Sequence, residues 1–136
     1  GVAAQVVQQD GAIGYMNYDY SRSPKLTQVK IQNKAGNYVT ADATTSSAGL
    51  SRIKLDDQLR GDNPNPGGAN SYPIVSLTWI LAYPESRTGI KDMLRYMLSE
   101  ESQALSDSLG FVPLPEELRQ KSLNAVEAIT EPSTGA

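Results

Sequence analysis

SYPIVSLTWILAY, residues 71–83, is the stretch that decides the fold of this 136-residue chain. Only Ser76 and Thr78 interrupt its apolar run, which is rich in β-branched and aromatic residues and lies between Pro73 and Pro84. A short apolar run between turn residues is typical of a strand that is buried on both faces, as in a mostly parallel sheet covered by helices. The sequence therefore predicts such a strand from Ile74 to Leu81, with one structural unit before it and another after it.

The residues before this stretch predict alternating helices and strands. Val2–Gln9 has the spacing of a short helix, and residues 12–18 alternate like a strand in which Gly14 allows a close backbone approach. Residues 26–32 predict a half-exposed strand, which residues 33–37 connect to Tyr38-Val39 as a hairpin. Asp42 or Thr44 is the expected N-cap of a helix that follows.

The residues after the stretch predict three helices. Apolar residues recur at helical spacing along one face of residues 88–98, namely at Ile90, Met93, Leu94, Met97 and Leu98. Ser99 is suited to cap a second helix that ends at Leu109-Gly110, and Pro115 starts a third. Leu118, Leu123, Val126 and Ile129 should form the buried side of this last helix. The predicted fold class is accordingly α/β.

Composition excludes several classes of site. The chain has no cysteine, which excludes disulfides, thiolate metal sites and cysteine nucleophiles, and no histidine, which excludes a Ser-His-Asp triad or a histidine-ligated zinc. A net charge of -3 without a basic stripe argues against a nucleic-acid partner. No apolar run reaches the ~18 residues that a membrane-spanning helix needs. The start at Gly1 without an initiator methionine indicates a processed or partial product.

A search for chemistry finds polar groups, and for each the structural interpretation is favoured. Adjacent carboxylates rarely acquire the different pKa values that acid–base catalysis needs, and the hydroxyl run suits a helix cap as well as an anion. The other candidates are hydroxyls on one strand face, three tyrosines that could form a stacking surface, and a glycine pair without the lysine of a P-loop. These groups are Asp56-Asp57, Glu100-Glu101, Thr44–Ser47, Ser76 with Thr78, Tyr15 with Tyr18 and Tyr20, and Gly67-Gly68.

Three segments together resemble the phosphate-binding proteins of ABC importers. GVAAQV at residues 1–6, followed by GAIGY at 11–15, resembles the helix and strand that come after the anion-binding loop of that family. SYPIVSLTWILAY at 71–83 resembles a late strand, and LGFVPLP at 109–115 resembles the start of the final helix. The segments match in order along the chain up to about residue 129.

The resemblance implies a type II periplasmic binding protein, in which a mixed sheet flanked by helices forms each of two lobes that close on orthophosphate. Such a protein is exported to the periplasm or cell surface and delivers phosphate to the membrane subunits of an ABC permease, as a monomer and without a cofactor. It further implies that this chain is only the C-terminal portion. Residues 1–62 would belong to the second lobe, 63–71 would be a hinge-like connector, 72–131 would return to the first lobe, and 132–136 would be a frayed tail.

The family binds phosphate through an Asp, an Arg, a Ser-Gly-Thr loop and further hydroxyls, all upstream of a segment like residues 1–4. No position here matches them, so the sequence predicts no phosphate-binding, catalytic or metal-binding residue within the chain. An enzyme lobe, a sensor lobe or a secreted structural protein that reuses this fold are the alternatives, because a fold does not fix a function.

Overall fold

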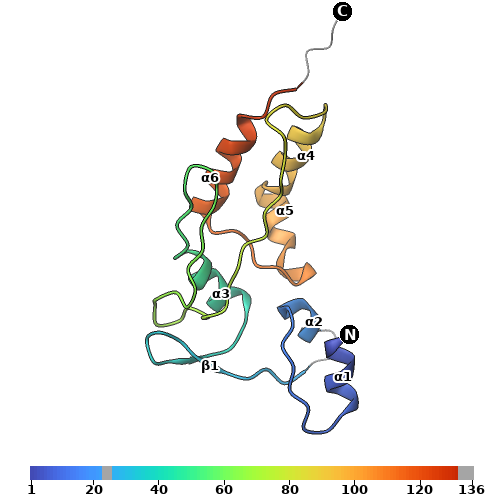
Figure 1. The fold of residues 1–136 in the computed structure, drawn as a ribbon, viewed down its shortest axis with the longest axis vertical. Coiled ribbons are helices and arrows are strands. Elements are labelled where there is room, and N and C mark those ends of the chain that lie inside the picture. Colours follow the sequence, from blue (N-terminus) through green and yellow to red (C-terminus); the bar gives the residue numbers. More distant parts are fainter. Residues whose placement is uncertain (23–25, 132–136) are drawn as a thin grey trace, which may run out of the picture.

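The computed structural model describes residues 1–22 and 26–131, which form three groups of elements (Figure 1). Helices α1 and α2 form the first group, a hairpin with α3 forms the second, and α4, α5 and α6 form the third. The frayed tail predicted at 132–136 lies outside the described residues.

The N-terminal group confirms the first helix but not the strand after it. Helix α1 spans Val2–Gln8, and α2 spans Tyr18–Arg22, while residues 12–17 are extended without a ladder partner among the described residues. A side chain at Gly14 would come within 2.7 Å of Val2, so the predicted close backbone approach is made to α1. The predicted strand at 12–18 is wrong because no neighbouring strand lies within the described chain to complete its hydrogen bonds.

The hairpin is confirmed, with shorter strands than predicted. Strand β1 (Ile31–Gln32) pairs antiparallel with β2 (Tyr38–Val39), with Ile31 opposite Val39. Residues 26–30 precede β1 without joining the ladder. Gly36 adopts φ 87°, which suits glycine in the tight connection.

Helix α3 (Ala43–Leu50) begins at a complete capping box. The Asp42 side chain accepts a hydrogen bond from the Thr45 amide at 2.7 Å, and the Thr45 hydroxyl accepts one from the Asp42 amide at 3.2 Å. Asp42 is therefore the N-cap, as one of the two predicted alternatives stated. Leu50 at the end of α3 and Ile53 just after it are buried, as is Val39 of the hairpin.

The predicted connector is bonded to this second group. Asn33, which is only 5% exposed, donates its side-chain amide to the carbonyl oxygens of Gly68, Ala69 and Ser71 at 3.3, 2.8 and 3.2 Å. The side chain of Asn63 donates to the carbonyl oxygen of Arg52 at 2.8 Å. These contacts fasten residues 63–71 to the hairpin and α3. The division of the chain into two lobes stays a prediction.

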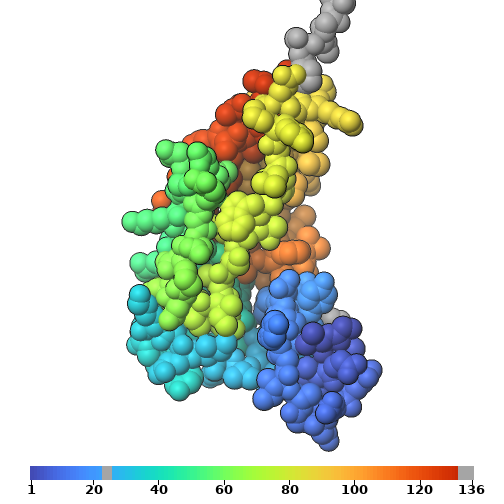
Figure 2. Space-filling model, in the orientation of Figure 1, coloured from blue at the N-terminus to red at the C-terminus, as the bar shows by residue number. Residues whose placement is uncertain are grey.

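The stretch at 71–83 forms no strand among the described residues. Residues 74–83 are extended, and Ile74 and Leu81 are 70% and 95% exposed (Figure 2, yellow-green to yellow). The prediction of a strand buried on both faces is therefore wrong for this chain by itself. The physical reason is that a central strand needs two neighbouring strands and a covering layer, and the described residues supply neither.

The third group contains the three predicted helices. Helix α4 spans Ile90–Met97 and α5 spans Glu100–Leu105, and Ser99 caps α5 by accepting a hydrogen bond from the Ser102 amide at 3.1 Å. The short 3-10 helix η1 (Asp107–Leu109) ends at Gly110, whose φ is 83° as expected of a left-handed cap. Helix α6 spans Glu116–Glu127 and packs on α4 (Figure 1).

Leu94 of α4 and Leu118 and Val126 of α6 are the buried apolar residues of this group. The predicted helix stripe is thus only partly covered, since Met93 and Met97 stay on the surface. The described residues form a mixture of helices and short strands, and their sheet has two strands. The predicted mixed sheet flanked by helices is not formed within them.

Candidate functional site

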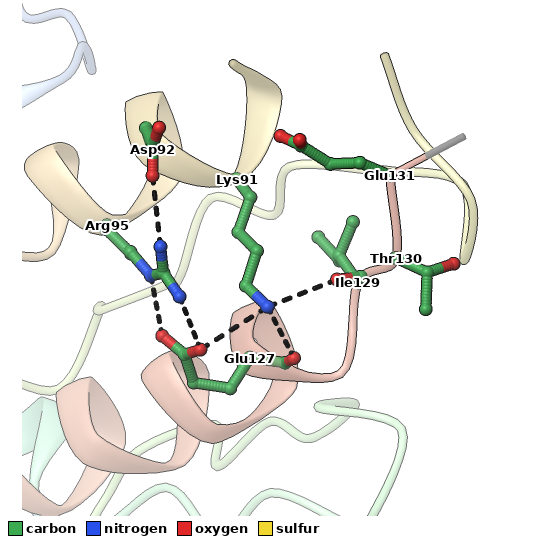
Figure 3. A pocket seen from close by; sticks show the side chains of 7 residues that line it. All are labelled: Lys91, Asp92, Arg95, Glu127, Ile129, Thr130 and Glu131. Carbon is green, nitrogen blue, oxygen red and sulfur yellow. Dashed lines mark hydrogen bonds and ion pairs between the residues drawn. The ribbon is translucent and has the colours of Figure 1, made fainter. Parts of the chain in front are cut away.

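A hollow with a volume of about 540 Å³ lies between α4 and the C-terminal end of α6 (Figure 3). Its walls are predominantly charged. The lining residues are Lys91, Asp92, Arg95, Glu127, Ile129, Thr130 and Glu131.

Lys91 binds the end of α6. Its ammonium group donates to the carbonyl oxygens of Glu127 and Ile129 at 2.8 and 3.2 Å and lies 3.4 Å from the Glu127 carboxylate. The last carbonyls of a helix have no intrahelical donor and carry the negative end of the helix dipole. Lys91 of α4 therefore supplies the hydrogen bonds that the carbonyl groups at the end of α6 lack.

Arg95 and Glu127 form a bidentate pair. The guanidinium Nε and Nη2 lie 2.7 and 2.6 Å from the two carboxylate oxygens, and Nη1 lies 3.0 Å from Asp92 Oδ1. The hydrogen bonds from Arg95, followed by those from Lys91, lower the pKa of Glu127 to about 2. The same contact with Glu127, followed by that with Asp92, raises the pKa of Arg95. Arg95 and Glu127 therefore both stay charged across the physiological pH range.

Glu131 occupies the N-terminus of α4. Its Oε1 accepts a hydrogen bond from the Gly89 amide at 3.1 Å. The hollow thus holds two cations, Lys91 and Arg95, and three carboxylates, those of Asp92, Glu127 and Glu131, a sum of -1. A phosphate entering here would meet carboxylates that already occupy the donors. The cluster joins α4 to α6 and does not fit an anion-binding site.

The hydroxyl run at 44–47 is used within the fold. Thr45 completes the capping box and also donates to the carbonyl oxygen of Thr40 at 2.7 Å, while Ser46 is buried. The cap interpretation of this run is therefore confirmed.

The glycine pair is not an anion cradle either. The carbonyl oxygens of Gly67 and Gly68 accept hydrogen bonds from Ser71 Oγ and Asn33 Nδ2 at 2.8 and 3.3 Å. Both carbonyl oxygens are therefore used within the fold.

The remaining sequence candidates do not converge on one place. Asp56 accepts hydrogen bonds from the amides of Gln58 and Arg60 at 2.9 and 2.8 Å, and the Arg60 amide, as the largest influence, lowers the pKa of Asp56. The exposed Glu100 carboxylate lies 3.6 Å from the guanidinium of the largely buried Arg119. Both carboxylate pairs are solvated, as predicted, and Asp57 and Glu101 are exposed.

Neither the strand hydroxyls nor the tyrosines form a binding surface. Ser76 and Thr78 are exposed, and Ser76 donates only to the neighbouring Leu77 carbonyl at 3.3 Å. Tyr15 is 94% exposed, whereas Tyr18 carries the Arg22 guanidinium 5.6 Å from its ring centre.

In the described ranges 1–22 and 26–131, no group of three or more metal-binding side chains is close enough to hold an ion. Within the same ranges, no helix has the length and hydrophobicity to cross a membrane.

The ion-pair cluster of Figure 3 is the feature that the sequence did not indicate. The spacing of Lys91, Asp92 and Arg95 on one helix was the available signal. The partner Glu127 is 32 residues further on from Arg95 and is brought there only by the packing of α4 on α6.

The chain is similar over almost its whole length to curated phosphate-binding proteins. It is 30% identical over 152 residues to "Phosphate-binding protein PstS" of Methanocaldococcus jannaschii, which covers 96% of this chain and 38% of that protein. It is 30% identical over 128 residues to the protein of the same name from Pasteurella multocida, with 89% and 37% covered. It is 29% identical over 141 residues to "Phosphate-binding protein PstS 3" of Mycobacterium tuberculosis, with 95% and 38% covered.

These similarities confirm the resemblance that residues 1–15, 71–83 and 109–115 predicted. The chain spans little more than a third of the length of each relative named above. No protein-family model matches the chain.

Proposed function

From its homology with phosphate-binding proteins, we propose that this chain serves as the C-terminal part of a solute-binding protein that carries orthophosphate to an ABC permease. The observation that carries the proposal is the 30% identity to the Methanocaldococcus jannaschii phosphate-binding protein over 96% of the chain. The role is binding and transport rather than catalysis, since the relatives are named for binding. The place of action is outside the cytoplasmic membrane, where such a protein meets both its ligand and the permease.

The residues that bind phosphate lie in the part of the binding protein beyond this chain. Two observations support this assignment. The chain corresponds to 38% of the first relative, and both cations of the hollow between α4 and α6 are already paired with the Glu127 carboxylate. A tight phosphate site needs several donors directed at one anion. In this hollow, Lys91 and Arg95 donate to carboxylates and backbone carbonyls instead.

The proposed lobe division has residues 1–62 in one lobe, 72–131 in the other and 63–71 as one hinge segment. The composition of 61–70, with its prolines and glycines, supports a change of direction there. The bonds from Asn33 and Asn63 keep the connector on the side of the first of these lobes. A closing motion would absorb its change of backbone dihedral angles within this connector.

A thermal-shift titration of the complete parent protein with phosphate, sulfate and a neutral sugar tests the proposal. Ligand binding to the folded state stabilises by mass action, about 2.7 kcal/mol at a ligand concentration 100 times the Kd. We expect phosphate to raise the unfolding temperature, and the neutral sugar to leave it unchanged. A parent protein that phosphate does not stabilise at millimolar concentration would overturn the proposed function.

A further inference from the structure

Residues 54–61, here called the bridging loop, are held in one shape by contacts within the loop. The Asp56 amide donates to the carbonyl oxygen of Arg60 at 2.9 Å, and the Arg60 guanidinium lies 2.9 Å from the Asp56 carboxylate. At the base of the loop, a side chain on Gly61 would come within 2.2 Å of the Lys54 carbonyl oxygen. The two ends of the loop therefore lie directly against each other.

Leu59 has an unusual backbone conformation in this loop. Its φ is 58°, in the left-handed region where the Cβ atom of an L-residue comes too close to a carbonyl oxygen. Such a conformation persists only where the surrounding structure holds it, and it is a reason to look for a function. The Leu59 carbonyl oxygen accepts a hydrogen bond from the Trp79 indole at 2.6 Å. The strained residue is thus one that joins the loop to a later part of the chain.

A second donor reaches the bridging loop from α6. The Lys121 ammonium group donates to the carbonyl oxygen of Leu55 at 2.5 Å, which places the loop beside α6 (Figure 1, loop in green). Both residues are half-buried. A hydrogen bond from an ionised donor is stronger than one between neutral groups. The bridging loop is therefore bonded to later residues through two of its carbonyl oxygens.

These two hydrogen bonds join the parts of the chain that the proposed lobe division separates. The bridging loop lies within residues 1–62, whereas Trp79 and Lys121 lie within residues 72–131. Lys121 is 66 residues away from Leu55 along the chain, so this contact does not follow from the connector between the lobes. Separation of the lobes would break both hydrogen bonds, whereas contacts within one lobe would survive it.

We propose that the bridging loop holds the two lobes in the closed arrangement, and that Trp79 and Lys121 are positioning residues for phosphate binding. The inference rests on the proposed function and its lobe division. A ligand that binds only the closed arrangement has an apparent Kd that rises as the closed fraction falls. Loss of either hydrogen bond therefore weakens phosphate binding without removing a group that contacts the anion.

Isothermal calorimetry with phosphate on variants of the complete parent protein tests this inference. Lys121→Met removes the ammonium group and keeps an unbranched apolar side chain, so the Kd should rise about threefold to tenfold. Trp79→Phe keeps an aromatic ring but removes the N–H donor, and should change the Kd in the same direction. Lys121→Arg keeps a cationic donor and should leave the Kd within about twofold of the unchanged protein.

Lys91→Met is the matched control, because Lys91 also donates to backbone carbonyl oxygens. Its acceptors, Glu127 and Ile129, lie with it inside the same proposed lobe. This variant should lower the stability of the protein and leave the Kd within about twofold, since opening of the lobes does not break its hydrogen bonds. Equal Kd values for Lys121→Met and Lys91→Met would show that Lys121 only stabilises the fold, and would overturn the proposal.

Small-angle scattering of the parent without phosphate separates the two claims. Lys121→Met should have a larger radius of gyration than Lys91→Met, because its lobes are no longer held together. A parent that binds no phosphate refutes the proposed function, and an equal radius in the two variants would then refute the bridging loop as well. A parent that binds phosphate equally well in both variants refutes the role of the bridging loop alone.

Discussion

Replacing Asn33 by alanine should release the connector from the hairpin. The Asn33 side chain is buried, and its two amide hydrogens are shared among the carbonyl oxygens of Gly68, Ala69 and Ser71 at 2.8 to 3.3 Å. Its oxygen accepts two further hydrogen bonds at 3.0 Å from amides of the hairpin turn. Four bonds at about 0.5–1.5 kcal/mol each, with the turn amides partly rehydrated after the change, give a loss of about 3 kcal/mol.

The measurement is urea unfolding of the 136-residue chain, followed by the fluorescence of Trp79, its only tryptophan. This residue reports on the same unit, because its indole is bonded to the loop after α3. About 3 kcal/mol corresponds to about two orders of magnitude in the unfolding equilibrium constant.

Asn37→Ala is the matched control, since the Asn37 side chain makes one exposed bond to the Ala69 carbonyl at 3.0 Å. Its expected cost is below about 1 kcal/mol. Asn33→Asp keeps the side-chain oxygen that accepts the turn amides and removes the NH2 group that donates to the connector. The loss of stability in this variant therefore measures the bonds to the connector alone. If Asn33→Ala costs no more than Asn37→Ala, the connector is not held as the structure shows.

Three further predictions concern the helices. The pKa of Glu127 is lowered from 4.5 to about 2, so its ion pairs stabilise the fold above about pH 4.5 and are lost as the pH falls through about 2. The melting temperature of the Glu127→Gln variant should therefore change less with pH in that window than the melting temperature of the unchanged 136-residue chain. Identical pH profiles of the two would contradict this. Gly110→Ala should lower the free energy of unfolding, measured by calorimetry, more than Gly36→Ala does, because both glycines have positive φ but only Gly110 lies against α2. Equal losses in the two variants would show that α2 does not pack there. Asp42→Ala should remove the cap of α3 at a cost of about 1 kcal/mol in urea unfolding, while Thr44→Ala should cost under about 0.5 kcal/mol.

Local signals in the sequence predicted the helices well. The apolar spacing of 88–98, the serine at position 99 and Gly110 each correspond to an observed feature of α4, α5 and η1. The hairpin turn at 33–37 was predicted for the same reason, because its geometry is set within a few residues. Such features need no distant partner to form.

The sheet and the ion-pair cluster depend on distant partners. Residues 12–18 and 74–81 have the composition of strands, but composition does not supply the neighbour that a strand must bond to. In the described chain residues 12–17 and 74–81 stay extended, and Tyr15 and Leu81 remain exposed. The Arg95–Glu127 pair was missed for a related reason, since it exists only once α6 packs on α4.

Isothermal calorimetry with phosphate, on the complete parent protein and on the 136-residue chain, tests the central claim most directly. The account predicts heat of binding for the parent and none for the chain alone, because the donors directed at the anion lie outside these residues. Tight, stoichiometric phosphate binding by the isolated chain would contradict it.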